Sequence, residues 1–468
     1  MIRFSAVRRL TAAPLNPAGP TRPGCEPRTP APPATMSQPS AQTACRDNRL
    51  SRRAHWAGGQ PIASILMAKT LAHPEIVSLA AGFVDNATLP AAPTRIAIEA
   101  IWSDPELARA ALQYSSTIGY PPLRAALLDR MLRADRSTAE ELNLSPGQVV
   151  ITAGSNQLLY LVGDVLLDPG DVVLCGAPTY FVYLGTLANL GARAVGVATD
   201  AEGLIPEALD EQLARFQSEG QLHRVKAVYV TSYYDNPTGA TIPEVRRAAL
   251  VDLVRRWSRT HKIYLIEDTA YRELRYWGDD VRSMRSMDPD GDSVIVAGSF
   301  SKAYSPGIRI GWGILPPALV EPVLGAKGNL DFGSPNFNQV LMATVLEMGL
   351  FDAHVETLRA CYRGKIEAVL DAAGQFLRPS GGIDWVGPAG GLYLWPRLPD
   401  ALDTGVAGPL FDRAVEEGVL YVPGAVCYPS EGCTVPVNRL RLSFGIPSCD
   451  EIRRGVEALA RTIRQVLR

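Results

Sequence analysis

Residues 298–313 read Gly-Ser-Phe-Ser-Lys-Ala-Tyr-Ser-Pro-Gly-Ile-Arg-Ile-Gly-Trp-Gly, which combines a reactive amine with several donors for an anion. Lys302 supplies the amine, Ser299 and Ser301 flank it with hydroxyls, and Arg309 follows within the same stretch. The apolar run 294–297 just before it predicts a buried strand. Lys302 is therefore expected just beyond the carboxyl end of that strand, where open α/β sheets place their ligands.

Outward from this stretch, short β-branched runs alternate with longer helical patterns, which is typical of a mostly parallel sheet covered by helices. The predicted strands are seven, at residues 149–152, 172–175, 194–197, 227–230, 263–266, 294–297 and 309–312. Helices are predicted between them, for example at 155–167 and 244–260. The last two strands are too close together for a helical crossover, which predicts an antiparallel pair there.

The pattern changes after about residue 315 to long helices, predicted at 317–330, 336–359 and 360–376, and then to short strands around 391–395 and 440–444. This change predicts a second, smaller α+β domain. The predicted organisation is an extension at 1–55, an N-terminal segment with part of the small domain at 56–108, a large cofactor-binding domain at 109–330, and a linking helix with the C-terminal small domain at 331–468.

The first 55 residues differ from the rest of the chain. They are rich in proline and arginine, contain only Glu26 and Asp47 as acids, and have no sustained apolar periodicity, which predicts disorder. Basic residues with few acids are also typical of a mitochondrial presequence, but closely spaced prolines shorten any amphipathic helix. Because Met36 offers a plausible start, we interpret this part as a spurious or dispensable extension.

Composition limits the partners and the compartment. Lys and Arg total 46 against 48 Asp and Glu, and no basic block lies in the body of the chain, so a nucleic-acid partner has no electrostatic support. Apolar stretches fall short of the roughly 20 residues that span a bilayer, so no membrane partner is expected. The seven cysteines form no C-x-x-C pair and the five histidines are scattered, which predicts no metal site and a reducing, cytoplasmic location.

Asp268 ends the hydrophobic strand that contains Leu265 and Ile266. A buried carboxylate there is costly unless it meets a cation, although a helix N-cap is the simpler alternative. A protonated pyridine nitrogen is such a cation, and a charged ring withdraws electrons from a bound substrate. Glu267 faces the other way by strand alternation and is interpreted as structural. With the amine of Lys302, this pattern predicts pyridoxal 5'-phosphate as the cofactor.

A phosphate position is predicted where residues 151–157 pass from a strand through a glycine turn into a helix. Backbone N–H groups near Ser155 and Asn156 form the positive end of a helix dipole there, although a plain N-cap at Ser155 would look the same. The turn alone is weak support. Arg309, Ser299 and Ser301 add independent phosphate donors, and together they favour the anion-binding interpretation.

Other side chains are candidates for the ring and the substrate. Asn236 precedes a proline and is held extended, so its amide can donate to the phenolic oxygen of the ring, and Tyr271 is a second candidate for that oxygen. Tyr180 follows a strand and could stack on the ring or simply belong to the core. Arg441 lies on a predicted late strand, where a substrate carboxylate would match it; Arg439 shares its face, and a surface ion pair stays open for either.

Together these motifs resemble the class I/II aminotransferases of fold type I. The resemblance rests on Ser-Phe-Ser-Lys302 with Arg309, Asp268-Thr-Ala-Tyr271, Asn236-Pro-Thr-Gly239, Pro178-Thr-Tyr180 and Arg441. It covers the chain from about residue 60 to the end, and the stretches 112–120, 388–395 and 422–424 are most similar to the branch of aminoadipate and kynurenine aminotransferases.

The resemblance implies a homodimer with shared active sites, in which Tyr114 reaches the phosphate of the other chain. It also implies an N-terminal segment that covers the substrate, with Gly82 at the carboxylate end. Two positions depart from the usual pattern. Asn156 stands where glutamine or alanine is commoner, and Asp235 stands where glutamine often precedes the asparagine. The side-chain specificity is therefore open, and Asp235 could favour a polar or cationic substrate.

The implied activity is transfer of an amino group between an L-amino acid and a 2-oxo acid, with 2-oxoglutarate as the expected acceptor. A lyase on the same scaffold is the alternative enzyme. A ligand-sensing transcription regulator is a further alternative, but it needs a DNA-binding element at the N-terminus. Residues 1–55 are too rich in proline for three packed helices.

Overall fold

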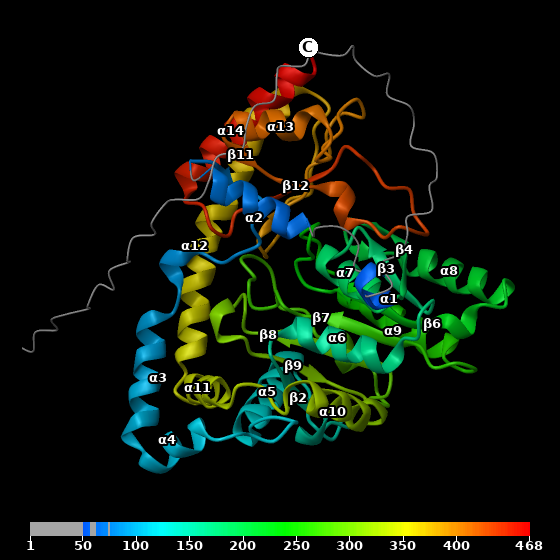
Figure 1. The fold of residues 1–468 in the computed structure, drawn as a ribbon, viewed down its shortest axis with the longest axis vertical. Coiled ribbons are helices and arrows are strands. Elements are labelled where there is room, and N and C mark those ends of the chain that lie inside the picture. The colour runs from blue at the N-terminus through cyan, green and yellow to red at the C-terminus, as the bar shows by residue number, and fades with distance from the viewer. Residues whose placement is uncertain (1–49, 57–61, 74) are drawn as a thin grey trace, which may run out of the picture. The chain divides into compact units, whose positions relative to one another are not determined.

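The computed structural model describes residues 50–56, 62–73 and 75–468, and an eight-stranded sheet is its central element (Figure 1). Its strands, in spatial order, are β2 (Val149–Thr152), β9 (Gly311–Ile314), β8 (Val294–Ser299), β7 (Tyr264–Asp268), β6 (Val225–Thr231), β3 (Val172–Ala177), β4 (Arg193–Asp200) and β5 (Gly203–Leu204). All seven predicted strands are present. The eighth, β5, is a two-residue edge strand antiparallel to β4, too short to stand out in the sequence.

The predicted antiparallel pair is confirmed, since β9 runs antiparallel to both β8 and β2. The start predicted for β9 was wrong by two residues. Arg309 precedes the strand and ends a short 3-10 helix with a left-handed backbone, φ 52°, because the turn at Pro306–Ile308 must reverse the chain before pairing can begin. This geometry frees the Arg309 side chain from the sheet.

Helices cover both faces of the sheet, which explains why its strands are apolar on both sides. Leu174 and Leu265 face α5 (Pro121–Asp135), α8 (Pro206–Ser218), α9 (Glu244–Trp257) and α11 (Asn336–Glu347). Val173 and Ile266, one residue away on the same strands, face α6 (Ser155–Leu166), α7 (Phe181–Asn189) and α10 (Pro317–Asp331). Alternation therefore sends neighbouring side chains of each strand into different cores.

A second core packs around a three-stranded sheet, in the order β10 (Tyr393–Leu394), β13 (Leu440–Ser443), β12 (Val422–Pro423). Around it lie α12 (Leu350–Ala372), α13 (Pro409–Glu416) and α14 (Cys449–Val466), with α12 running from α11 toward α14 (Figure 1). The N-terminal region contributes α2 (Ile62–Ala72) and β1 (Val77–Ser78), and β1 pairs parallel with β11 (Val419–Leu420).

The described residues of the segment 56–108 divide between the two cores. Leu66 and Leu79 belong to the second core, whereas α3 (Ala91–Ser103) and α4 (Pro105–Leu112) pack against α11. Ala97 and Ile101 of α3 lie in the first core. The domain boundaries given above stay a prediction.

The helix boundary predicted at residues 359 and 360 was wrong. The chain breaks instead between α11 and α12, at Gly349, whose φ is +69°. A left-handed backbone favours glycine and ends a helix, whereas residues 350–372 contain no proline and their one glycine, Gly364, does not take a positive φ. The apolar periodicity continues across residue 359, so α12 is one long helix.

The predicted extension at 1–55 lies outside the described residues except for its last six. Whether the extension is disordered therefore stays a prediction; within the described part, α1 (Arg52–Trp56) contacts α7. A Cβ on Gly191 would come 2.8 Å from the ring of Trp56, so this glycine lets the indole approach closely. Arg53 adds an ion pair with Asp164 at 3.7 Å.

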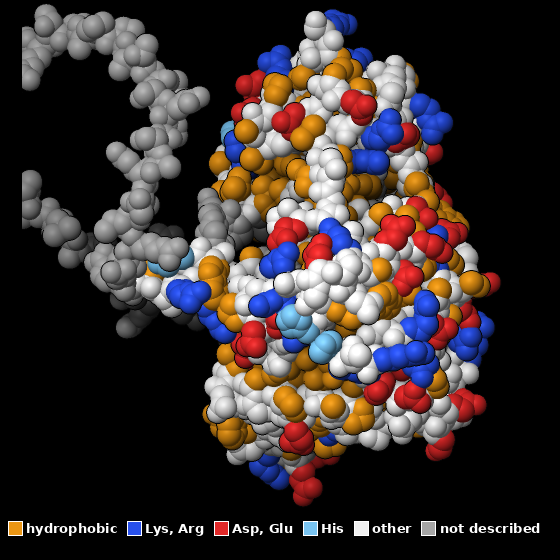
Figure 2. Space-filling model, turned by 90° about the vertical axis from the view of Figure 1, so that its right-hand side faces the viewer, with side chains coloured by type: hydrophobic (Ala, Val, Ile, Leu, Met, Phe, Trp, Pro, Cys, Tyr) orange, Lys and Arg blue, Asp and Glu red, His pale blue; other side chains and the backbone are white. Residues whose placement is uncertain are grey.

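The surface shown in Figure 2 carries Lys and Arg side chains interspersed with Asp and Glu, rather than a field of one sign. Within residues 50–56, 62–73 and 75–468, no helix is both long enough and apolar enough to cross a bilayer. The same residues contain no cluster of histidine, cysteine or acidic side chains arranged to hold a metal ion.

Candidate active site

A cavity of about 330 Å³ opens where the strands β6, β7 and β8 end, between the two cores. Its walls contain every predicted site residue except Tyr114, namely Gly82, Ser155, Asn156, Tyr180, Asn236, Asp268, Tyr271, Ser299, Ser301, Lys302, Arg309 and Arg441. The first and the last of these residues, Gly82 and Arg441, lie more than 350 positions apart in the sequence. The volume lies in the range of ordinary ligand pockets.

Lys302 follows β8 and extends its amine into this cavity. Its Nζ donates to the carbonyl of Gly82 at 2.7 Å, and no carboxylate among the described residues lies within ion-pair distance of it. Burial lowers the pKa of the Lys302 amine below its usual range. An amine with a lowered pKa is more readily deprotonated, and the free lone pair can attack a carbonyl or accept a proton.

Asp268 ends β7 on the same side of the sheet, with 5% of its surface exposed. Its carboxylate accepts from the Tyr229 hydroxyl at 2.9 Å and from the backbone N–H of Ala270 at 3.0 Å. Burial raises the pKa of Asp268, and no lysine or arginine of the described chain forms an ion pair with it. The carboxylate is therefore ready to accept a cation inside the cavity.

Donors for an anion gather at one end of the cavity. Gly154, with φ +85°, turns the chain into α6, and the first two residues of that helix, Ser155 and Asn156, border the cavity. A Cβ on Gly154 would come 2.6 Å from Nη2 of Arg309, so only glycine lets this guanidinium lie against the turn. The exposed Arg309 donates to two backbone carbonyls of the described chain, those of Pro306 and Ala153.

The two serines beside Lys302 complete this end. The Ser299 hydroxyl donates to that of Ser301 at 2.9 Å, and it accepts from the Ser301 backbone N–H at 3.1 Å. Both hydroxyls border the cavity. A helix N-terminus, a guanidinium and two hydroxyls form a set of donors that suits a phosphate group.

A chain of hydrogen bonds lines the opposite wall. Arg441 donates to the side-chain oxygen of Asn236 at 2.7 Å, and the Asn236 amide lies 3.5 Å from the Tyr271 hydroxyl. The Tyr271 hydroxyl in turn lies 2.9 Å from that of Tyr393. Arg441 is 2% exposed, its guanidinium carbon lies 4.3 Å from the centre of the Tyr393 ring, and its Nε has no partner.

Arg441 rather than Arg439 faces this cavity, which resolves the alternative left open by the sequence. Arg439 is partly exposed and borders a separate hollow next to Trp395. Gly82 lies against the same wall as Arg441, since a Cβ there would come 2.8 Å from the Tyr393 hydroxyl and 3.8 Å from Nη2 of Arg441. An anion that reached Arg441 would therefore pass directly over Gly82.

Of three further positions singled out from the sequence, one borders the cavity and two do not. Tyr180 precedes α7 and borders the cavity, where burial raises its pKa to about 12. Tyr114 lies away from the cavity, is 78% exposed, and packs edge-on against Phe332 at 5.4 Å. Asp235 does not line the cavity, and its carboxylate accepts from the Thr238 hydroxyl at 2.8 Å; the idea that it selects a polar or cationic substrate stays an untested prediction.

Two tyrosines of the site were not singled out from the sequence. Tyr229 on β6 donates to Asp268, and Tyr393 on β10 contacts Tyr271 and Arg441. A tyrosine buried in a predicted apolar strand needs a hydrogen-bond partner, and this requirement was the available signal for Tyr229. Nothing local marks Tyr393, because its partners lie more than 40 positions away.

The residues present fit pyridoxal phosphate. The cavity offers an amine with a lowered pKa, a buried carboxylate that has no cation, and a separate group of phosphate donors. An aldehyde, a pyridine nitrogen and a phosphate would satisfy these three features respectively.

Comparisons with known proteins agree with this geometry. Residues 74–459 match the model of the family described as aminotransferase class I and II. Aromatic-amino-acid aminotransferase 1 of Thermococcus litoralis is 33% identical over 358 residues, which cover 76% of this chain and 81% of that protein.

Two crystal structures share the fold and contain a bound form or derivative of the cofactor. Kynurenine aminotransferase of Pyrococcus horikoshii, in complex with PMP, superposes with a TM-score of 0.81 at 31% identity over 90% of this chain and 98% of its own. The α-aminoadipate aminotransferase of Thermus thermophilus, complexed with N-(5'-phosphopyridoxyl)-L-leucine, gives 0.76 at 31% identity over 90% and 98%. The resemblance to the aminoadipate and kynurenine branch is thereby confirmed.

The fold is that of the fold type I enzymes, the cofactor is pyridoxal phosphate, and the reaction moves an amino group between an amino acid and a 2-oxo acid. This chain belongs to the class I and II aminotransferase family.

Proposed function

We propose that Lys302 and Asp268 carry the transamination, with the other cavity residues holding cofactor and substrate. The observation that supports this most is their shared cavity, in which a buried amine and a buried carboxylate both lack a counter-ion within ion-pair distance. Pyridoxal phosphate, when bound, supplies an aldehyde that reacts with amines and a ring that accepts electrons.

Each group of residues has one task in this proposal. The carboxylate of Asp268 keeps the proton on the pyridine nitrogen. Asn236 and Tyr271 hydrogen-bond the phenolic oxygen, and Tyr180 covers the ring face. The phosphate is held by the N-terminus of α6 with Ser155, Asn156, Ser299, Ser301 and Arg309.

The amine of Lys302 moves the proton. With the cofactor and an amino acid in the cavity, the neutral Nζ of Lys302 would take the proton from the substrate α-carbon and donate it again later in the same half-reaction. Burial lowers the pKa of Lys302, which favours the neutral amine that this step needs. Gly82 holds the free amine by its carbonyl at 2.7 Å, close to its point of action.

Arg441 positions the substrate. Its guanidinium is held between the Asn236 side chain and the Ala80 carbonyl, at 2.7 and 2.8 Å, and its unpartnered Nε leaves a donor for a carboxylate. With Gly82 below it, this arginine fixes the α-carboxylate and thereby directs the α-hydrogen of the substrate toward Lys302.

A half-reaction tests the proposal. The cofactor-loaded protein is mixed with amino acids and no 2-oxo acid, and absorbance, 2-oxo acid and ammonia are followed. We expect one conversion to the pyridoxamine form, with one equivalent of 2-oxo acid and no continued release of ammonia. Continuous ammonia release would indicate a lyase instead. The choice of 2-oxoglutarate as acceptor stays a prediction that an acceptor screen tests.

We also propose a homodimer with shared sites, in which Tyr114 reaches the phosphate of the partner subunit. Large apolar side chains near Tyr114 are exposed in the single chain, including Leu112 at 72% and Phe332 at 62%. Exposed apolar patches of this kind are typical of interfaces. Sedimentation should give twice the mass of one chain, and Tyr114→Phe should weaken cofactor binding without dissociating the dimer.

A cytoplasmic location is part of the same proposal. The cysteines of the described region, Cys175, Cys361, Cys427, Cys433 and Cys449, are all free thiols. Free thiols are typical of reducing compartments. Fractionation of cells that express the protein would test this location.

A further inference from the structure

A second cavity, of about 400 Å³, adjoins the candidate active site. The two cavities share Gly82, Phe83, Phe181 and Arg441 in their walls. Any substrate whose carboxylate is held by Arg441 and Gly82 therefore has this second cavity within reach of its side chain.

The walls of the second cavity are mainly apolar. Leu66 and Met67 of α2 form one side, and Ile76, Phe83 and Phe181 form others. The polar groups of Thr70 and Ser78 are uncharged hydroxyls, and that of Thr70 already donates to the carbonyl of Leu66. Such walls suit a side chain of carbon atoms.

Only two charged residues line this cavity among the described residues, Arg441 and Glu451. Arg441 is committed to Asn236 and to the α-carboxylate. The carboxylate of Glu451 accepts from the backbone N–H and the hydroxyl of Ser448, each at 2.8 Å, which caps α14. Neither residue is free to neutralise a charge at the end of a substrate side chain.

The covering helix does not supply a cation either. Lys69 is the only basic residue of α2, and it lies outside the cavity wall, with its amine 3.8 Å from Asp412. The sequence just before α2, residues 57–61, contains no charged residue.

Resting on the proposed function, we propose that the second cavity receives the side chain of the amino donor, and that it selects a long, apolar, uncharged side chain. A carboxylate or an ammonium group buried there would lose its hydration without gaining a partner. A methyl group at the same place would lose nothing and bury apolar surface. The second carboxylate of 2-oxoglutarate would also find no cation in this cavity. The inference therefore disfavours 2-oxoglutarate, the predicted acceptor.

Three amino acids of matched length test the selection. Norleucine, 2-aminoadipate and lysine share a chain that ends in methyl, carboxylate and aminomethyl respectively. With the cofactor-loaded protein and no acceptor, we expect kcat/KM for norleucine to exceed that for each charged analogue at least about 100-fold. Equal or faster conversion of 2-aminoadipate or lysine would overturn the inference and leave the proposed function standing.

Binding gives a readout that does not depend on turnover. Hexanoate and adipate differ in the same way, and calorimetry on the cofactor-loaded protein should show tighter binding of hexanoate by at least about tenfold. Tighter binding of adipate would overturn the inference. If no amino acid converts the cofactor, the proposed function fails, and the inference about the amino donor fails with it.

Variants of α2 locate the effect. Thr70→Arg brings a cation into the cavity and should reduce the preference for norleucine over 2-aminoadipate at least about tenfold, whereas Thr70→Leu should keep it. Lys69→Met should leave the preference unchanged, because Lys69 lies outside. A loss of 2-aminoadipate conversion in Lys69→Met would show that this lysine reaches the substrate, and would overturn the inference.

Discussion

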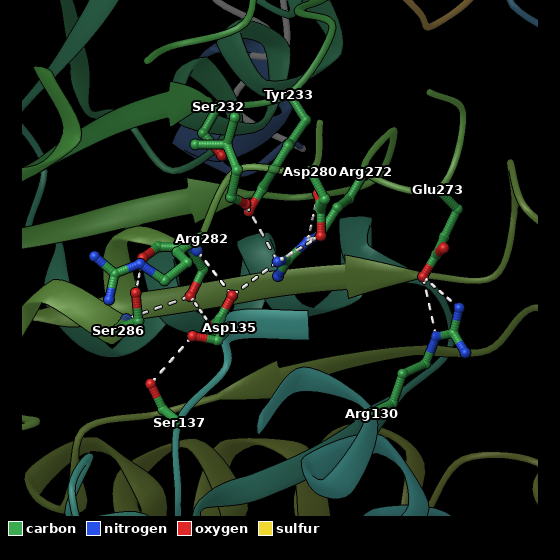
Figure 3. A network of polar contacts seen from close by, with 12 residues as sticks. Arg130, Asp135, Ser137, Ser232, Tyr233, Arg272, Glu273, Asp280, Arg282 and Ser286 are labelled. Carbon is green, nitrogen blue, oxygen red and sulfur yellow. Dashed lines mark hydrogen bonds and ion pairs between the residues drawn. The ribbon is translucent and has the colours of Figure 1, made fainter. Parts of the chain in front are cut away.

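The two faces of β7 carry neighbouring carboxylates with different surroundings. Glu267 and Arg247 are both fully buried and form an ion pair at 3.2 Å, and Glu267 also accepts from the Ser232 hydroxyl and the Met284 N–H. Nearby on that face, Arg272 lies between Asp135 and Asp280, at 2.8 and 3.0 Å (Figure 3). Every charge named here has a counter-charge.

On the other face, the charged side chains have no partner of opposite charge among the described residues. Among the residues that the structure describes, Asp268 contacts a hydroxyl and an N–H but no cation, and Lys302 contacts a carbonyl but no carboxylate. Burial raises the pKa of both Glu267 and Asp268, so burial alone does not distinguish them. The missing counter-charge distinguishes the two carboxylates, and it indicates that Asp268 is the one available to a ligand.

The largest effect is expected from Lys302→Ala. Loss of the amine that moves the proton should reduce the half-reaction rate by about 10⁴-fold, as measured by stopped-flow absorbance. Lys327 is the control, because it is a buried lysine, 0% exposed, that is paired with Asp331 at 2.8 Å. Lys327→Met should lose stability and keep turnover, and equal activity of the two variants would contradict the comparison.

Asp268→Asn should come next. Without the negative charge, the ring proton is no longer held, and kcat should fall by about 10³-fold. The protein without cofactor should be at least as stable as the wild type in urea unfolding, because an uncompensated buried charge has been removed. A variant that unfolds easily but turns over normally would assign Asp268 to the structure instead.

Glu267→Gln should show the opposite pattern. It leaves the buried Arg247 without its counter-charge, so the free energy of unfolding should fall by about 3 kcal/mol. The activity per folded molecule should stay within a few-fold of the wild type. Urea titration followed by kinetics on the folded fraction measures both quantities, and a selective loss of kcat would break the contrast between the two faces.

Asp235 gives the smallest expected effect. Burial raises its pKa to about 6 from an ordinary 3.8, so the folded state favours the protonated form. The stability that this form contributes is complete below pH 3.8 and is lost as the pH rises through 6. The stability advantage of Asp235→Asn over the wild type should therefore grow by about 1 kcal/mol as the pH rises from 5 to 7. A pH-independent difference in urea unfolding would contradict the raised pKa.

The sequence predicted the large sheet and most of the cavity, because both depend on local patterns. Apolar runs predicted the strands, and polar side chains at the ends of those runs predicted Lys302 and Asp268. Arg309 was predicted in its role as an anion donor but not in its conformation, since a left-handed backbone at arginine is rare and is imposed by the turn.

Features that depend on distant contacts were missed. Tyr393 meets Tyr271 across 122 positions, and α1 is held by Trp56 against Gly191. The break at Gly349 was missed because apolar periodicity continues on both sides of it. The charge balance around Asp268 could not be read from sequence either, since it depends on which arginines fold onto which face.

The most direct measurement identifies the amine that bonds the cofactor. The protein is loaded with pyridoxal phosphate, reduced with borohydride, digested, and analysed by mass spectrometry. The account predicts a phosphopyridoxyl group on the peptide that contains Lys302. A modification on another lysine such as Lys327 or Lys365, or none at all, would contradict it.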